Sequence, residues 1–170
     1  GGLNITLKTL LDPGDEVIIF APYFVEYLFY ADNHGGKAVA VPTLNDFRLN
    51  FEALQNALNE KTKAVIINSP NNPTGVLYSR QELQELARVL KAHSNKIGKA
   101  VYLISDDPYK KITFDGVEAP NIMEFYQDSI YITSHSKDIA LPGERIGFLA
   151  VHPQCESAGL LVAGLIFCNR

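Results

Sequence analysis

Short apolar runs recur along this chain, and segments with helical periodicity separate them. The runs are mostly continuous rather than alternating, which is typical of strands covered on both faces of a sheet. This alternation leaves few choices of fold, because strands that are joined through helices usually pair in parallel. The six predicted strands are residues 16–20, 37–41, 64–68, 100–105, 129–133 and 146–151.

The predicted helices fill the gaps between these strands. Residues 79–93 give the clearest signal, because Ser79 and Glu82 form a capping box and apolar residues recur along one face. Asn50 is the predicted N-cap of another helix. The full set is residues 3–11, 23–33, 50–59 and 79–93, with a last helix after Pro153.

The pattern predicts a single α/β domain, a three-layer αβα sandwich with a mostly parallel sheet. A chain of 170 residues, of which 46% are hydrophobic and 20% charged, is long enough to bury one core. The net charge of −4 and the lack of a basic stripe argue against nucleic-acid binding. The apolar run at residues 159–168 is too short to span a bilayer, so we expect no membrane partner.

The histidines and cysteines give no sign of a metal site. Cys155 and Cys168 have neither metal-ligand spacing nor the pattern of a disulfide framework. We therefore expect no metal and a reduced, cytoplasmic setting. Metal-ligand spacing is also lacking at His34, His93, His135 and His152.

Polar and aromatic clusters follow four of the predicted strands directly. Because ligands bind at the carboxyl ends of the strands in open α/β sheets, these clusters are expected to meet along one edge. This convergence points to a binding site more strongly than any one loop does. The clusters are residues 21–24, 68–75, 106–109 and 134–137.

Lys137 is the residue with the most specific chemistry. An amine must be neutral to attack an aldehyde, and burial or a nearby positive charge such as Arg145 favours that state. The planar guanidinium of Arg145 also suits a phosphate, which the hydroxyls of Ser134 and Ser136 can reach. The alternative is that the lysine and the arginine are ordinary solvated surface residues.

Each of the other loops has a functional and a structural interpretation. Asp106 suits a carboxylate that keeps a ring nitrogen protonated, or it caps a turn. Tyr109 suits a hydroxyl donor to a phenolate oxygen, or it belongs to the core. Residues 71–75, Asn-Asn-Pro-Thr-Gly, fit a tight turn before the next helix. We expect Asp107 to be solvated.

A Ser-His-Asp hydrolase site is the competing interpretation of the same loops. Ser134, His135 and Asp106 supply the three residue types. However, a serine rarely faces a base that is adjacent to it in sequence, and no Gly-x-Ser-x-Gly elbow is present. The hydrolase hypothesis is therefore weak.

Taken together, these motifs resemble the class I/II aminotransferases, the fold-type I enzymes that use pyridoxal 5′-phosphate. The resemblance covers essentially the whole chain, and the motifs occur in the order that the family shows. They are Asp12-Pro13-Gly14-Asp15-Glu16-Val17, Asn72-Pro73-Thr74-Gly75, Asp106-x-x-Tyr109, and Ser134-x-Ser136-Lys137 followed by Gly143-x-Arg145-x-Gly147.

The resemblance implies a role for each matching position. Lys137 would form the Schiff base with the cofactor and then act as general base and acid. Asp106 would pair with the pyridinium nitrogen and sustain the electron sink. The remaining implied contacts are Asn72 and Tyr109 to the 3′ oxygen of the ring, Arg145 with Ser134 and Ser136 to the phosphate, and Phe24, or Tyr23 in a shifted register, stacked on the ring.

The resemblance also implies how residues 1–170 relate to a whole enzyme. They match the pyridoxal-phosphate-binding large domain, without the N-terminal segment, most of the glycine-rich phosphate loop, or the C-terminal small domain that helps to choose the substrate. The family sheet has seven strands, so one would precede Gly1, and residues 146–151 would be its antiparallel strand. We expect this piece alone to be inactive and the full-length protein to be a homodimer.

Three functions are compatible with these residues. The first is an aminotransferase acting on an amino acid and a 2-oxo acid. The second is a carbon–sulfur β-lyase, which uses the same lysine on the same scaffold. The third is a transcription regulator that keeps an aminotransferase-like domain as a sensor. The sequence favours the first without identifying the amino acid.

Overall fold

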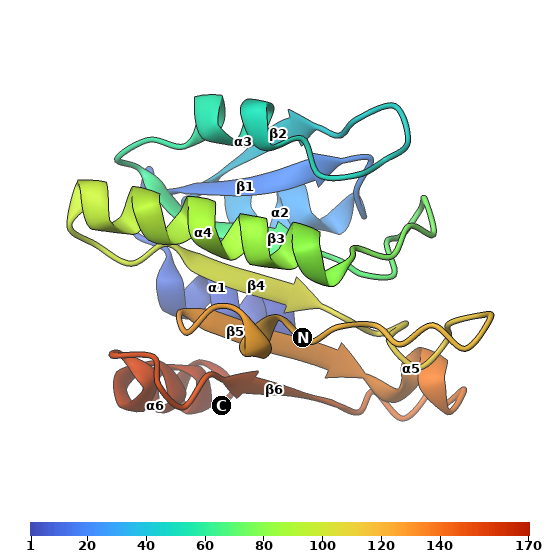
Figure 1. Ribbon diagram of the computed structural model, residues 1–170. Helices are drawn as coiled ribbons and strands as arrows, with labels where there is room; N and C mark the ends of the chain where they lie inside the picture. Colours follow the sequence, from blue (N-terminus) through green and yellow to red (C-terminus); the bar gives the residue numbers. More distant parts are fainter.

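The computed structural model describes all of residues 1–170, which form one six-stranded sheet with helices on both faces (Figure 1). The strand order is β2-β1-β3-β4-β5-β6, and only β6 runs antiparallel to its neighbour. The predicted three-layer α/β fold with one antiparallel strand is therefore confirmed. The strands are β1 (Glu16–Ala21), β2 (Lys37–Pro42), β3 (Thr62–Ile67), β4 (Tyr102–Asp106), β5 (Ser129–Ser134) and β6 (Gly147–Val151).

Two hydrophobic clusters lie on opposite faces of the sheet. Along β3, Val65 belongs to the cluster under α3 and α4, whereas Ile66 belongs to the cluster under α1, α2 and α6. This alternation along a continuous apolar strand is what burial on both faces requires. The helices are α1 (Gly2–Leu10), α2 (Glu26–Asp32), α3 (Phe51–Ala57), α4 (Arg80–Ile97), α5 (His135–Asp138) and α6 (Ala158–Cys168), with a short 3₁₀ turn η1 (Ile122–Glu124).

The edges of the sheet differ from its centre. Most residues of β2 and β6 are exposed or half-buried, whereas the middle of β1, β3 and β4 is buried. Continuous apolar runs therefore predicted the strands correctly but not the burial of the two outer ones. No helix combines the length and the apolar character needed to cross a membrane.

Helix α2 begins later than the sequence suggests. Tyr23 and Phe24 lie in the turn that follows β1, and the first helical residue is Glu26. The expected start of the helix at residue 23 is therefore wrong. The aromatic side chains of Tyr23 and Phe24 are held close to the carboxyl end of β1.

The direction of the strands places the four polar clusters on the same side of the sheet, at the carboxyl ends of the parallel strands. β1, β3, β4 and β5 are mutually parallel along the sheet, so their carboxyl ends point the same way. In the register, Asp106 pairs with Ile132, and Ser134 pairs with Gly147 of the antiparallel strand. A side chain at Gly147 would collide with the backbone oxygen of Thr133, so the close approach of β6 requires glycine.

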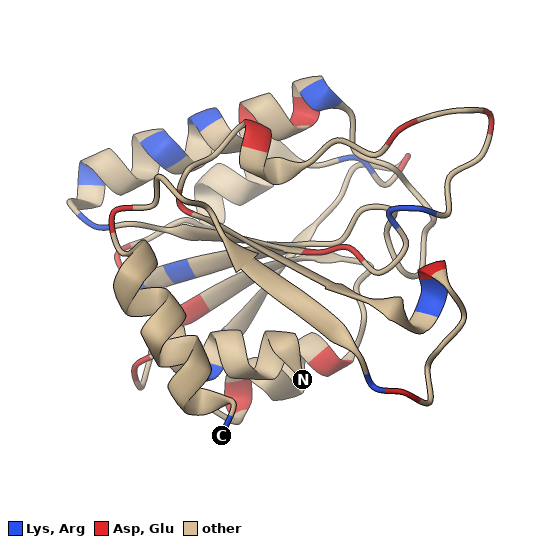
Figure 2. Cartoon of the chain, turned by 90° about the horizontal axis from the view of Figure 1, so that it is seen from below, with Lys and Arg blue, Asp and Glu red and all other residues tan.

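Charged side chains are distributed unevenly over the helices (Figure 2). Helix α4 carries several, whereas α6 has no Lys, Arg, Asp or Glu. Leu160 and Phe167 of α6 are 81% and 76% exposed. This helix therefore presents an apolar surface that the described residues leave uncovered.

The capping box predicted for the longest helix is confirmed. Ser79 Oγ accepts from the backbone N–H of Glu82 at 3.2 Å, and Glu82 Oε2 accepts from the backbone N–H of Ser79 at 2.9 Å. Gly98, with φ of 69°, ends the helix in the left-handed conformation. The ends of α4 are therefore fixed by local chemistry.

We expect Ser79→Ala to lower the free energy of unfolding of the full-length protein by about 1 kcal/mol, because a backbone donor at the helix start loses its partner. Gln84→Ala, on the exposed face of the same helix, is the matched control and should change stability by less than about 0.5 kcal/mol. Thermal unfolding of the two variants measures the difference. Equal effects of both substitutions would contradict the assignment.

Candidate functional site

Asp106 is the last residue of β4, and its carboxylate lies at the edge where the parallel strands end. Tyr27 of α2 donates its hydroxyl hydrogen to Asp106 Oδ2 at 2.8 Å. Burial raises the pKa of Asp106, while the hydrogen bond from Tyr27 opposes that rise. Burial and the charge of Asp106 hold the pKa of Tyr27 well above its usual range, so Tyr27 stays a donor.

Asn68 joins this carboxylate to the neighbouring loop. It is 3% exposed, and its Nδ2 donates to the backbone oxygen of Asp106. Its Oδ1 accepts from the backbone N–H of Asn72 at 2.6 Å. One buried amide thus fixes Asp106 and Asn72 relative to each other, a role that the sequence did not reveal.

Asn72 and Tyr109 face the same hollow. Both line a pocket of about 550 Å³ between residues 70–77 and the segment that follows β4. The Nζ atom of Lys137 lies 5.8 Å from the centre of the Tyr109 ring. The structure therefore brings three of the predicted site residues, from three different loops, to one place.

The short helix α5 holds Lys137 at the surface, where its side chain is exposed. Asp138, the next residue, accepts from Lys111 Nζ at 3.1 Å and lies 3.2 Å from His135 Nδ1. The imidazole of His135 is therefore paired with Asp138 and not with Asp106. This geometry gives no support to the Ser-His-Asp hydrolase alternative.

The predicted phosphate ligands are near one another in the chain but are not joined by a hydrogen bond. Arg145 is exposed, has φ of 55°, and donates to the backbone oxygen of Pro142 at 2.7 Å. Ser134 is half-buried at the end of β5, and Ser136 is half-buried in α5. A phosphate grip by these three residues remains a prediction.

Phe24 lies beside the tyrosine that contacts Asp106. The rings of Phe24 and Tyr27 are 5.7 Å apart and meet edge to face. Tyr23 is half-buried and packs against the same hydrophobic cluster. Phe24 therefore lies one side chain away from Asp106, and its stacking on a cofactor ring stays a prediction.

Asp107 was expected to be solvated, and that expectation is wrong. Its side chain points to the opposite face of the sheet from Asp106, and it is 2% exposed. Ser105 Oγ donates to Asp107 Oδ1 at 2.7 Å. Burial raises the pKa of Asp107 to about 7, with the bond from Ser105 and the charge of Lys110 acting against it.

The chemistry of these groups fits a phosphorylated aromatic cofactor. A buried carboxylate, two polar side chains that line one pocket, and an amine come from loops at the carboxyl ends of the strands, and these residue types suit the ring nitrogen, the ring oxygen and the aldehyde of such a cofactor.

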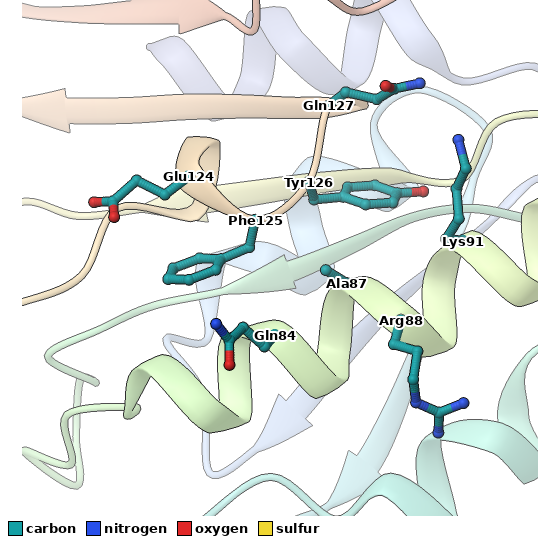
Figure 3. Close-up of a pocket in the computed structure, with 8 residues that line it drawn as sticks. All are labelled: Gln84, Ala87, Arg88, Lys91, Glu124, Phe125, Tyr126 and Gln127. Carbon is teal, nitrogen blue, oxygen red and sulfur yellow. The ribbon is translucent and has the colours of Figure 1, made fainter.

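A second hollow, of about 490 Å³, lies between α4 and η1 (Figure 3). It contains none of the predicted site residues. No group of three or more His, Cys, Asp or Glu side chains is placed to hold a metal ion. The lining residues are Gln84, Ala87, Arg88, Lys91, Glu124, Phe125, Tyr126 and Gln127.

Fold and site together are those of an α/β domain that gathers polar and charged side chains at the carboxyl ends of parallel strands. The family model for aminotransferase class I and II matches residues 1–167, and the chain belongs to this family. Members of the family depend on pyridoxal phosphate, in agreement with the donor set described above.

Individual relatives agree with this assignment. The chain is 39% identical over 154 residues to an aspartate aminotransferase of Bacillus subtilis, covering 87% of this chain and 38% of the relative. It is 37% identical over 149 residues to aromatic-amino-acid aminotransferase 2 of Thermococcus litoralis, covering 85% of this chain and 37% of that protein. The chain thus spans well under half the length of these relatives.

Solved structures show the same similarity. A crystal structure of an amino transferase from Eubacterium rectale superposes with a TM-score of 0.97 at 37% identity, covering 99% of this chain and 43% of that one. Aspartate aminotransferase from Thermus thermophilus with maleate gives a TM-score of 0.85 at 32% identity, covering 98% and 41%. The six-stranded arrangement is therefore that of aminotransferases.

The buried Asp107 predicts a specific dependence of stability on pH. Folded Asp107 keeps its proton up to about pH 7, whereas its ordinary pKa is 3.8, so the folded state binds more protons between these values. The stabilisation from this group is complete below the lower value and is lost as the pH rises through the higher one.

We therefore expect the full-length protein to lose stability relative to its Asp107→Asn variant between pH 5 and pH 8, by about 1–3 kcal/mol. Thermal unfolding across this pH range measures the gap. Asp115→Asn, at an exposed turn, is the control and should follow the unchanged protein. A constant gap between Asp107→Asn and the unchanged protein would show that Asp107 is ionised throughout.

Proposed function

We propose that the full-length protein is a pyridoxal-phosphate-dependent aminotransferase that transfers an amino group between an amino acid and a 2-oxo acid. The observation that carries this proposal is the grouping of Asp106, Asn72, Tyr109 and Lys137 at the carboxyl edge of the sheet, in a chain of this family. The names of the relatives, aspartate and aromatic-amino-acid aminotransferases, support the reaction class. They do not specify one amino acid.

Each residue has a defined task in this proposal. Asp106 would hold the ring nitrogen in its protonated form, and Asn72 and Tyr109 would donate to the ring's 3′ oxygen. Lys137 would bond to the cofactor and move the substrate's α-proton. The bound cofactor supplies an electron sink for the charge that this proton leaves behind.

The anionic and aromatic parts of the cofactor would be held by other groups. Arg145, Ser134 and Ser136 would bind the phosphate. The Arg145 side chain would have to leave the backbone oxygen of Pro142 to do so. Phe24 would stack on the ring, and its contact with Tyr27 favours it over Tyr23.

We further propose the setting in which this reaction occurs. Residues 1–170 would be the cofactor-binding large domain, and the whole protein would form a homodimer. A cytoplasmic location fits the two cysteines, Cys155 and Cys168, which are both free thiols. The measured mass of the full-length protein in solution tests the dimer.

We expect the full-length holoenzyme to convert an amino acid and a 2-oxo acid into the exchanged pair, without net release of ammonia. A panel of amino acids with 2-oxoglutarate, followed by chromatographic detection of both products, measures this. Ammonia and pyruvate from a cysteine conjugate, with no amino transfer to any acceptor, would instead establish the β-lyase. Cofactor binding without turnover of any substrate would favour the sensor domain.

We expect borohydride to fix the cofactor to Lys137 in the full-length holoenzyme, and peptide mapping to locate the modification there. Lys137→Ala should lose this modification and lower kcat by about 10²–10⁴-fold or more, since the acid–base group is removed. Lys110→Ala, in a neighbouring loop, is the control and should keep both. A modified lysine other than Lys137 would overturn the assignment.

A further inference from the structure

We propose that Tyr27 is the positioning residue of this site: its hydroxyl fixes the orientation of the Asp106 carboxylate and keeps it charged toward the cofactor. This inference rests on the proposed function and assigns a role to a residue that the motifs do not include. It was recognised only from the contact between α2 and the end of β4, two segments 79 residues apart in the sequence.

The geometry of the pair is specific. Tyr27 is 3% exposed, so its hydroxyl has little access to water and needs a partner inside the protein. It finds that partner in Asp106 Oδ2, at 2.8 Å. A phenol has one hydrogen to donate, and the raised pKa of Tyr27 keeps that hydrogen in place.

This single bond divides the two oxygens of the carboxylate between two tasks. Oδ2 is turned toward Tyr27, which leaves Oδ1 to meet the ring nitrogen of the cofactor. A donor to a buried carboxylate also favours the charged form, which burial alone would disfavour. Tyr27 would therefore act on the ring nitrogen through Asp106 without touching the cofactor itself.

A purely structural role does not account for the hydroxyl. The ring of Tyr27 packs in the apolar cluster under α1 and α2, and phenylalanine would fill the same space. The hydroxyl adds a polar atom at the border of this apolar cluster, and such an atom costs stability unless it is paired. Segment 24–27 thus brings two groups to the site, the Phe24 ring and the Tyr27 hydroxyl.

The test is Tyr27→Phe in the full-length holoenzyme. We expect kcat to fall about tenfold with KM for the amino acid changed by less than about twofold, because the loss acts on the charge of the cofactor ring and not on substrate binding. We expect the dissociation constant for pyridoxal phosphate, from absorbance titration of the apoenzyme, to rise about tenfold. Unchanged values of both kcat and this constant would overturn the inference.

A matched control is available on the same helix. Tyr30 donates its hydroxyl hydrogen to Glu26 and makes no hydrogen bond to Asp106, so Tyr30→Phe should leave kcat and cofactor affinity within about twofold. Should Tyr27→Phe fail to fold, Tyr27→Met fills the cluster with another apolar side chain and is measured in the same way. Equal losses in the Tyr30 and Tyr27 variants would overturn the inference.

A double-variant comparison separates positioning through Asp106 from general loosening of the fold. In an Asp106→Asn background, the added Tyr27→Phe change should lower kcat by less than about twofold, since the charge that Tyr27 supports is already gone. A full tenfold further loss would show that Tyr27 acts by another route and would overturn the inference. Failure of the unsubstituted protein to bind pyridoxal phosphate or transfer an amino group would instead contradict the proposed function itself.

Discussion

The parallel pairing of β1, β3, β4 and β5 is the constraint on which the rest of the molecule depends. Parallel strands require crossovers, and the crossover helices cover both faces of the sheet and bury two separate clusters. The same direction makes every loop after these strands open at one edge. Segments that are distant in sequence therefore meet there, and each of them contributes the residues that directly follow its strand.

At that edge, two adjacent carboxylates are kept apart by the pleat of β4. Asp106 faces the α1 and α2 side and is bonded to Tyr27, whereas Asp107 faces the α3 and α4 side and is bonded to Ser105. Each carboxylate has its own hydroxyl donor, so neither depends on the other for a partner. Asn68 then ties the backbone of Asp106 to the next loop.

The sequence predicted those features that local patterns determine. Apolar runs located all six strands, and the Ser79–Glu82 pair located the start of α4. The order of the polar clusters also predicted which loops would share an edge. These features succeed because the pattern and the structure it specifies lie within the same few residues.

The sequence did not predict contacts between residues that only the folded chain brings together. Tyr27 gives no sign of its bond to Asp106, because the two residues are 79 positions apart in the sequence and meet only in the folded chain. Asp107 was predicted to be solvated, but Ser69 and Thr133, which come from two other segments of the chain, contact it in the folded chain. Helix α2 starts at Glu26 and not at residue 23, because the apolar periodicity does not distinguish the first residues of a helix from the loop before it.

The loop that carries Lys137 is pinned at both of its ends. Ser134 and Gly147 pair across β5 and β6, and the backbone N–H of His135 donates to the oxygen of Ile146 at 3.0 Å. Because both ends of the loop are fixed, the Lys137 amine can move only within the reach of its own side chain and loop. Confinement of this kind raises the local concentration of a reactive group, and it does so before any partner molecule arrives.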